Sequence, residues 1–332
     1  MRFKTCYFVM IFFSLVIFLS CYKDINLDKY KTDPLLVLNC VISPDTVIMA
    51  SVTKTWFITE EEPKITVNDA EVELYLNGIF KENMSWMDTE HPNGGIYLSS
   101  VRPFCGDRIK IIATAGKEVI YAEDIVPPSV QIEGVHISKQ DYGKKMILIN
   151  QDGESVELYD KVEIKYEITF QDDPDEDNFY FVRIETCDPL QSLGYLDYSS
   201  DPVFILDESV LNGLSDGQSL SGAGGRTFSD QNIKGLKYTL SITESAPTGM
   251  YTYGKVNNRR IILYSLSAPY YKYLTSILKK TDEDVLLNLS EWGLSEPLGV
   301  YSNVINGKGI IGACQYDFTV IDLRDIIPPV YW

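Results

Sequence analysis

The sequence predicts a mainly β protein, in which an N-terminal β-sandwich is followed by a larger β-rich domain with one amphipathic helix. Three observations support this prediction. Apolar and polar residues alternate with a period of two in many segments, turn-forming pairs separate those segments, and only one segment has clear helical spacing. The chain has 332 residues, which is too long for one small module, so two domains are expected, with a single large β unit as the alternative.

The alternation is clearest in three segments. Residues 71–76 alternate and end at Asn77-Gly78, a pair typical of tight hairpin turns. Residues 109–114 alternate before Gly116-Lys117, and residues 162–170 place five apolar side chains on one face of a long strand. A slip of one residue would expose that whole face, so its register is strongly specified. Further strands are expected near 180–184, 238–242 and 261–266.

One helix is predicted after the last of these strands. Ser267 can cap its N-terminus, and Pro269 suits its first turn. Apolar residues from Tyr270 to Leu278 follow helical spacing, and Lys279-Lys280 would complement the negative C-terminal end. The aromatic stripe of this helix is interpreted as core packing rather than as a ligand platform.

Pro127-Pro128 interrupts the β pattern and predicts a domain boundary. The expected organisation is a signal peptide at 1–20, a tether at 21–30, a β-sandwich at 30–128 and a β-rich C-terminal domain at 129–332.

The N-terminus resembles a lipoprotein signal. A short basic start precedes the apolar run from Cys6 to Leu19, whose 14 residues would span only about 21 Å as a helix. That length favours a cleaved signal peptide over a membrane span. Residues 18–21 (FLSC) resemble a bacterial lipobox, which makes Cys21 the expected lipidation site, with palmitate among its acyl chains. The alternative is an ordinary secretory signal followed by an incidental cysteine.

The composition argues against several functional classes. The chain carries 29 Lys+Arg against 47 Asp+Glu, a net charge of −18, so phosphate backbones would repel it and nucleic-acid binding is not expected. Only two histidines occur, His91 in a turn and His136 in a strand, and both are interpreted as structural or surface residues. No nucleophile elbow, P-loop, zincin motif or dinucleotide-binding glycine pattern occurs. The protein is therefore expected to be no enzyme and to carry no cofactor.

Four cysteines would remain after processing, Cys40, Cys105, Cys187 and Cys314. Export leads to an oxidising compartment, so Cys40–Cys105 and Cys187–Cys314 are candidate disulfides that respect the domain division. The alternative is four buried free thiols.

Two segments are weak candidate sites. Asp173, Asp175 and Asp177 have the spacing of the first calcium ligands of a metal-binding loop, but Asn178 stands where that loop needs glycine. A solvated hairpin loop is the alternative, and no metal is favoured. The glycine-rich segment 212–230 is long enough to suggest a contact region, with Arg226 and Phe228 as candidate contact residues.

The order of several short motifs is similar to domain-of-unknown-function family 4249. Residues 70–74, 95–97 and 106–109 resemble an immunoglobulin-like or transthyretin-like sandwich, and similar motifs follow at 170–180, 228–238, 270–273, 296–303 and 307–312. The resemblance implies an outer-membrane lipoprotein of diderm bacteria and names no reaction. Lys23-Asp24 resembles a short signal for export to the cell surface, although a solvated linker explains it equally well.

Three functions follow as hypotheses. The first is a non-enzymatic envelope lipoprotein that binds a ligand or docks on a TonB-dependent outer-membrane transporter, a partner that the family resemblance suggests. The second is a structural or adhesive surface lipoprotein. The third, and the least favoured, is a glycan hydrolase that uses paired carboxylates.

Overall fold

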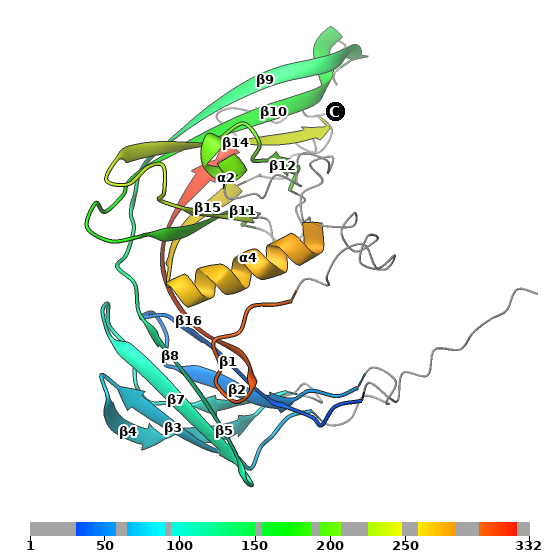
Figure 1. Ribbon diagram of the computed structural model, residues 1–332. Helices are drawn as coiled ribbons and strands as arrows, with labels where there is room; N and C mark the ends of the chain where they lie inside the picture. The colour runs from blue at the N-terminus through cyan, green and yellow to red at the C-terminus, as the bar shows by residue number, and fades with distance from the viewer. Residues whose placement is uncertain are drawn as a thin grey trace, which may run out of the picture.

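The computed structural model describes residues 31–57, 65–89, 94–149, 155–187, 193–206, 225–247, 258–282 and 299–323. Residues 1–30, with Cys21 and the Lys23-Asp24 pair, lie outside the described residues, as do His91 and residues 212–224 of the glycine-rich segment. Within the described residues the fold is mainly β, as predicted, and two sandwiches lie one above the other (Figure 1).

One eight-stranded sheet runs through both sandwiches. Its strand order is β13-β11-β15-β16-β1-β2-β6-β5. The strands are β1 (Leu36–Ile42), β2 (Met49–Lys54), β5 (Ser85–Asp88), β6 (Gly95–Leu98), β11 (Phe179–Thr186), β13 (Gly225–Ser229), β15 (Asn258–Leu266) and β16 (Lys308–Asp322).

Two four-stranded sheets complete the sandwiches. The first, in the order β4-β3-β7-β8, covers the N-terminal half of the long sheet, and the second, β12-β14-β10-β9, covers the C-terminal half. Their strands are β3 (Glu71–Leu76), β4 (Ile79–Asn83), β7 (Arg108–Ala115), β8 (Glu118–Ile125), β9 (Ile132–Ile149), β10 (Ser155–Gln171), β12 (Tyr195–Asp197) and β14 (Lys237–Pro247).

The last strand, β16, joins the two sandwiches. Its first part, Lys308–Ala313, pairs in parallel with β1, and its second part, Cys314–Asp322, pairs antiparallel with β15. The two main core clusters separate between Val126 and Val130, close to Pro127-Pro128, but Ile311 and Ala313 of β16 belong to the N-terminal core. A chain segment from the far end of the sequence therefore completes the N-terminal sandwich.

The strand predictions from periodicity are confirmed. All five apolar residues of the long face in β10 are at most 1% exposed, and they meet the inward residues of β11, β14 and β15. Asn77 and Gly78 have φ values of 53° and 79°, so both adopt the left-handed conformation that a tight hairpin turn requires between β3 and β4. Gly116, with φ 61°, begins the turn between β7 and β8.

The predicted helix is also confirmed. Helix α4 (Ala268–Asp282) begins after Ser267, whose Oγ accepts a hydrogen bond from the Tyr270 amide at 3.3 Å. It lies between the two sandwiches in Figure 1, against the face of the long sheet that the smaller sheets do not cover. Tyr270 packs over Gly312 of β16, and Tyr271 stacks on Phe179 at 4.7 Å between ring centroids.

A second, short helix was not predicted. Helix α2 (Pro202–Leu206) begins after Asp201, whose carboxylate accepts hydrogen bonds from the Val203 and Ser241 amides and the Tyr238 hydroxyl. Five residues give too little periodicity to distinguish such a helix from a loop.

A buried ion pair lies inside the C-terminal sandwich. Both side chains, Glu244 on β14 and Arg259 on β15, are 0% exposed. The guanidinium donates to the carboxylate from Nε at 3.0 Å and from Nη2 at 2.7 Å, and the Tyr166 hydroxyl and Gly194 amide also donate to it. Burial alone would raise the pKa of Glu244, but these donors together hold the pKa below its ordinary value.

Candidate functional site

A pocket of about 560 Å³ lies at the junction of the two sandwiches. Its wall on the N-terminal sandwich comes from the turn at Cys105 and Gly106, from Arg108, and from residues 123–128 at the end of β8. The opposite wall comes from residues 176–179, which lead into β11, and from residues 265–269 at the start of α4. We call this space the junction pocket. Binding sites for small molecules favour such boundaries between domains.

Asp124 connects three elements at this pocket. It follows Ile120 and Ala122 on the inward face of β8 and is 6% exposed. One carboxylate oxygen accepts a hydrogen bond from the Ile125 amide at 2.8 Å, and the other accepts a short hydrogen bond from the Ser267 hydroxyl. The Ser267 Oγ in turn accepts the amide of Ala313 on β16 at 3.1 Å. Ser267 at the start of α4 is therefore hydrogen-bonded both to β8 of the N-terminal sandwich and to β16, the strand that joins the sandwiches.

Burial raises the pKa of Asp124 to about 6, although the Ser267 hydroxyl and neighbouring backbone amides partly offset the effect. Among the described contacts, this carboxylate has only neutral hydrogen-bond donors and no cation. The donors lower the pKa less than burial raises it, so the pKa stays above its ordinary value. The Cys40 thiol lies near enough for the Asp124 charge to oppose its ionisation, and burial raises the pKa of Cys40 to about 12.

The raised pKa predicts a definite pH dependence. Folded Asp124 holds its proton more tightly than the unfolded chain does, so its contribution to stability is greatest below about pH 4 and declines as pH rises to about 6. The free energy of unfolding of Asp124→Asn minus that of the wild type should therefore increase by about 2–3 kcal/mol as the pH rises from 4 to 7. Urea unfolding of both proteins at each pH measures this difference. A difference that stays constant across the range would contradict the prediction.

The charged residues around the pocket are unevenly paired. Arg108 and Glu123 form an ion pair at 3.0 Å, and Asp177 pairs with Lys234 at 2.6 Å. Neither Asp124 nor Glu176 has a cationic partner among the described ion pairs. With one Arg and four carboxylates in its lining, the junction pocket has a formal charge of +1 − 4 = −3 when all are ionised.

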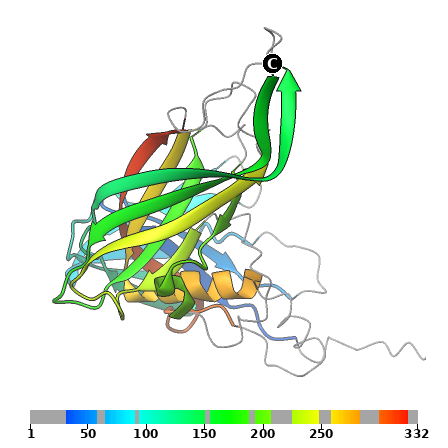
Figure 2. The ribbon, with the colours of Figure 1, turned by 90° about the horizontal axis from the view of Figure 1, so that it is seen from above.

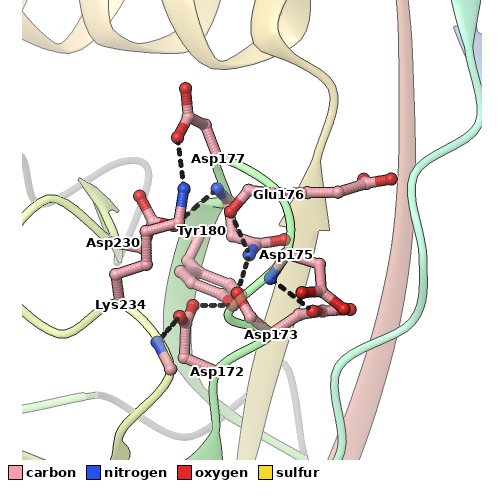
Figure 3. Close-up of polar contacts among 10 residues, drawn as sticks. Asp172, Asp173, Asp175, Glu176, Asp177, Tyr180, Asp230 and Lys234 are labelled. Atoms are coloured by element: carbon pink, nitrogen blue, oxygen red, sulfur yellow. Dashed lines mark hydrogen bonds and ion pairs between the residues drawn. The ribbon is translucent and has the colours of Figure 1, made fainter.

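The acidic loop next to this wall does not gather its carboxylates around one point. Asp173 accepts the Asp175 amide at 2.9 Å, whereas Asp177 points to Lys234 (Figure 3). The Asn178 side-chain amide donates to the backbone oxygens of Asp173 and Glu176 at 2.9 and 3.2 Å. In the described part of the chain, no group of three or more His, Cys, Asp or Glu could hold a metal ion. The loop is held by its own hydrogen bonds, and the calcium spacing of Asp173, Asp175 and Asp177 does not become a ligand set.

Asp172, at the start of the same loop, holds it in place through buried hydrogen bonds. It is 0% exposed and accepts hydrogen bonds from the Tyr180 hydroxyl and the Gly235 amide, both at 2.6 Å (Figure 3). Burial raises the pKa of Asp172, and burial together with this carboxylate raises the pKa of Tyr180. These contacts fix the position of residues 173–178 and therefore of one wall of the junction pocket.

The two candidate contact residues differ in their accessibility. Phe228 is 0% exposed and packs against Phe170, Tyr180 and Phe204 in the C-terminal core. Its ring is not accessible to a partner, so the expectation for Phe228 is corrected. The Arg226 guanidinium is half-buried and lies over the Tyr198 ring at 5.5 Å. Residues 212–224, the remaining part of the glycine-rich segment before Arg226, lie outside the described residues.

The four cysteines are free thiols in the structure, and neither candidate disulfide forms. Cys40 and Cys314 are buried, whereas Cys105 and Cys187 are exposed, so the expectation of four buried thiols holds for only two. Burial also raises the pKa of Cys314 to about 12. His136 is exposed on β9 and lies opposite Glu167 on β10, as expected for a surface residue.

Comparison with known families matches residues 22–319 to the model for Domain of unknown function (DUF4249). The chain belongs to the DUF4249 family. The match covers both sandwiches and confirms the resemblance that the order of the motifs indicated. No curated protein matches the chain. Among the described residues of this DUF4249 protein, neither helix is long and apolar enough to cross a membrane.

Sequence reasoning did not find the junction pocket. One signal was present, because the alternation Ile120-Ala122-Asp124-Val126 places a carboxylate on an otherwise apolar face of β8. A buried acid in that position needs a specific partner. The partner, Ser267, is 143 residues away in the sequence, and only the tertiary structure brings the two together.

Proposed function

We propose that this DUF4249 protein is a non-enzymatic, lipid-anchored outer-membrane protein that binds a ligand in the junction pocket and assists a TonB-dependent transporter. The observation that carries the ligand-binding part is the pocket itself, which is formed by four separate chain segments between two sandwiches. The lipobox-like FLSC segment supports the anchor. Two or more acyl chains would hold such a protein firmly at the membrane.

A projecting ribbon supports a docking role. Strand β14 pairs with β10 only over Lys161–Gln171, so the outer part of the β9–β10 hairpin is a two-stranded ribbon. It extends well beyond the body of the protein in Figure 2. Ile147 on this ribbon is 67% exposed and Tyr159 is 40% exposed. Isolated ribbons of this kind are only marginally stable, and their free edges can pair with another chain.

The anchor predicts the outcome of metabolic labelling. We expect a fatty-acid probe to label the wild type and to leave Cys21→Ala unlabelled, with Cys105→Ala as a labelled control. Cys21→Ala should also leave the membrane fraction. Equal labelling of wild type and Cys21→Ala would contradict the anchor.

The transporter partnership is tested by crosslinking and affinity purification from detergent-solubilised membranes. We expect the wild type to recover a TonB-dependent transporter, and a variant with residues 144–158 replaced by a two-residue turn to recover much less of it. A structural or adhesive lipoprotein would recover no transporter from either form, and deletion of its gene would leave nutrient uptake normal.

A further inference from the structure

The charges and the apolar surface of the junction pocket together indicate the class of ligand, an inference that rests on the proposed ligand-binding role. We propose that the pocket binds an organic cation: an amine or guanidinium group carried on an apolar, preferably aromatic, body.

The first step is the electrostatic balance. Of the four carboxylates in the lining, Glu123 is neutralised by Arg108 and Asp177 by Lys234. Asp124 and Glu176 have no cationic partner among the ion pairs of the described residues, so the pocket keeps two such negative charges when both are ionised. A cation that enters the pocket meets an uncompensated negative field, whereas an anion would add a third like charge.

The two remaining carboxylates differ in their surroundings. Asp124 is buried at the base of α4, where its charge already complements the positive N-terminal end of the helix through Ser267. This contact removes the usual preference of a helix N-terminus for an anion. Glu176 is exposed, and Figure 3 shows its side chain extending away from the acidic loop and from Lys234. A ligand cation could therefore approach Glu176 without displacing an existing ion pair.

The second step is the apolar part of the lining. Phe179, Leu266 and three prolines, Pro127, Pro128 and Pro269, contribute carbon surface to the same pocket. Phe179 already stacks on Tyr271 of α4, so its position is fixed by packing. Apolar walls with a few polar groups are typical of small-molecule sites, in which the apolar surface provides affinity and the charges orient the ligand. A bare metal ion or a polyamine would leave these walls unused.

The test compares three probes that share one aromatic body and differ in charge: phenethylamine, 2-phenylethanol and phenylacetate. The mature chain is titrated with each at pH 7.5, and binding is measured by ligand-observed NMR and by shifts of protein resonances. We expect phenethylamine to bind roughly tenfold more tightly than the alcohol, and phenylacetate not to bind measurably.

Two variants with equal charge change locate the site. Glu176→Gln removes a carboxylate that lines the pocket, and Asp175→Asn removes one from the neighbouring position outside the lining. Both residues are exposed, so neither change should disturb the fold. We expect Glu176→Gln to weaken phenethylamine binding roughly two- to fivefold, and Asp175→Asn to leave it nearly unchanged.

The outcomes separate the ligand class from the ligand-binding role. If the alcohol or phenylacetate binds at the pocket as well as the amine does, the pocket is a ligand site and the cationic class is overturned. If Glu176→Gln binds the amine as tightly as the wild type does, the assignment of the cation to this pocket is overturned. If none of the three probes binds, both the ligand class and the proposed role of the pocket fail.

Discussion

Glu244→Gln is expected to lower the free energy of unfolding by about 3–5 kcal/mol. The glutamine would keep the shape of the side chain but remove the negative charge that faces the Arg259 guanidinium in a site that is 0% exposed. Nearby, the Tyr166 hydroxyl donates to the same carboxylate at 2.6 Å and would lose a charged acceptor. Urea unfolding monitored by circular dichroism measures the loss.

A double variant separates the buried charge from the packing. Glu244→Leu/Arg259→Met removes both charges, and we expect it to lose less stability than Glu244→Gln alone, since replacing a whole buried pair by apolar residues is often close to neutral. Glu123→Gln is the matched surface control. Its ion pair with Arg108 is about half exposed, so the change should stay within about 0.5 kcal/mol. A loss below 1 kcal/mol for Glu244→Gln would contradict the assigned role.

The second large effect is expected at Gly309, where β16 meets β1. Gly309 has φ +113°, and a Cβ added there would lie 2.1 Å from the backbone oxygen of Leu38. The neighbouring strand cannot yield at a backbone atom without breaking the parallel pairing of Leu38 with Gly309. We expect Gly309→Ala to cost about 3 kcal/mol or more, through backbone strain and overpacking.

The position of the damage is as informative as its size. Because Gly309 lies where β16 completes the N-terminal sandwich, Gly309→Ala should unfold that sandwich first and split a single urea transition into two. Gly134→Ala is the control, since a Cβ at that strand glycine meets nothing within 4 Å. A single unshifted transition for Gly309→Ala would contradict the claim that the N-terminal sandwich depends on the close pairing of Gly309 with Leu38.

Much of the fold is predictable from local pattern. The long face of β10, the Asn77-Gly78 turn and the cap of α4 at Ser267 each depend on residues close together in the sequence. Periodicity, turn chemistry and capping report such local features directly. The family resemblance is likewise confirmed by a match across residues 22–319.

The features that build the pocket depend on contacts between distant residues. Nothing local in Lys308–Ala313 indicates that it returns to pair with β1, more than 260 residues earlier. The same is true of Asp124 and Ser267. The calcium-like spacing of Asp173, Asp175 and Asp177 is also no guide to their placement, because Asp177 pairs with Lys234 and the Asn178 side chain donates to the loop backbone. Phe228 has no local feature that distinguishes a core ring from a contact ring.

The most direct test of the account is native-state hydrogen exchange on the mature chain, because a fixed junction pocket requires the two sandwiches to open as one unit. We predict that amides of Leu38 on β1, Val182 on β11 and Ile311 on β16 exchange with the same free energy of opening, equal to that of global unfolding. A free energy several kcal/mol lower for β1 than for β11 would show two independently opening sandwiches and contradict the account.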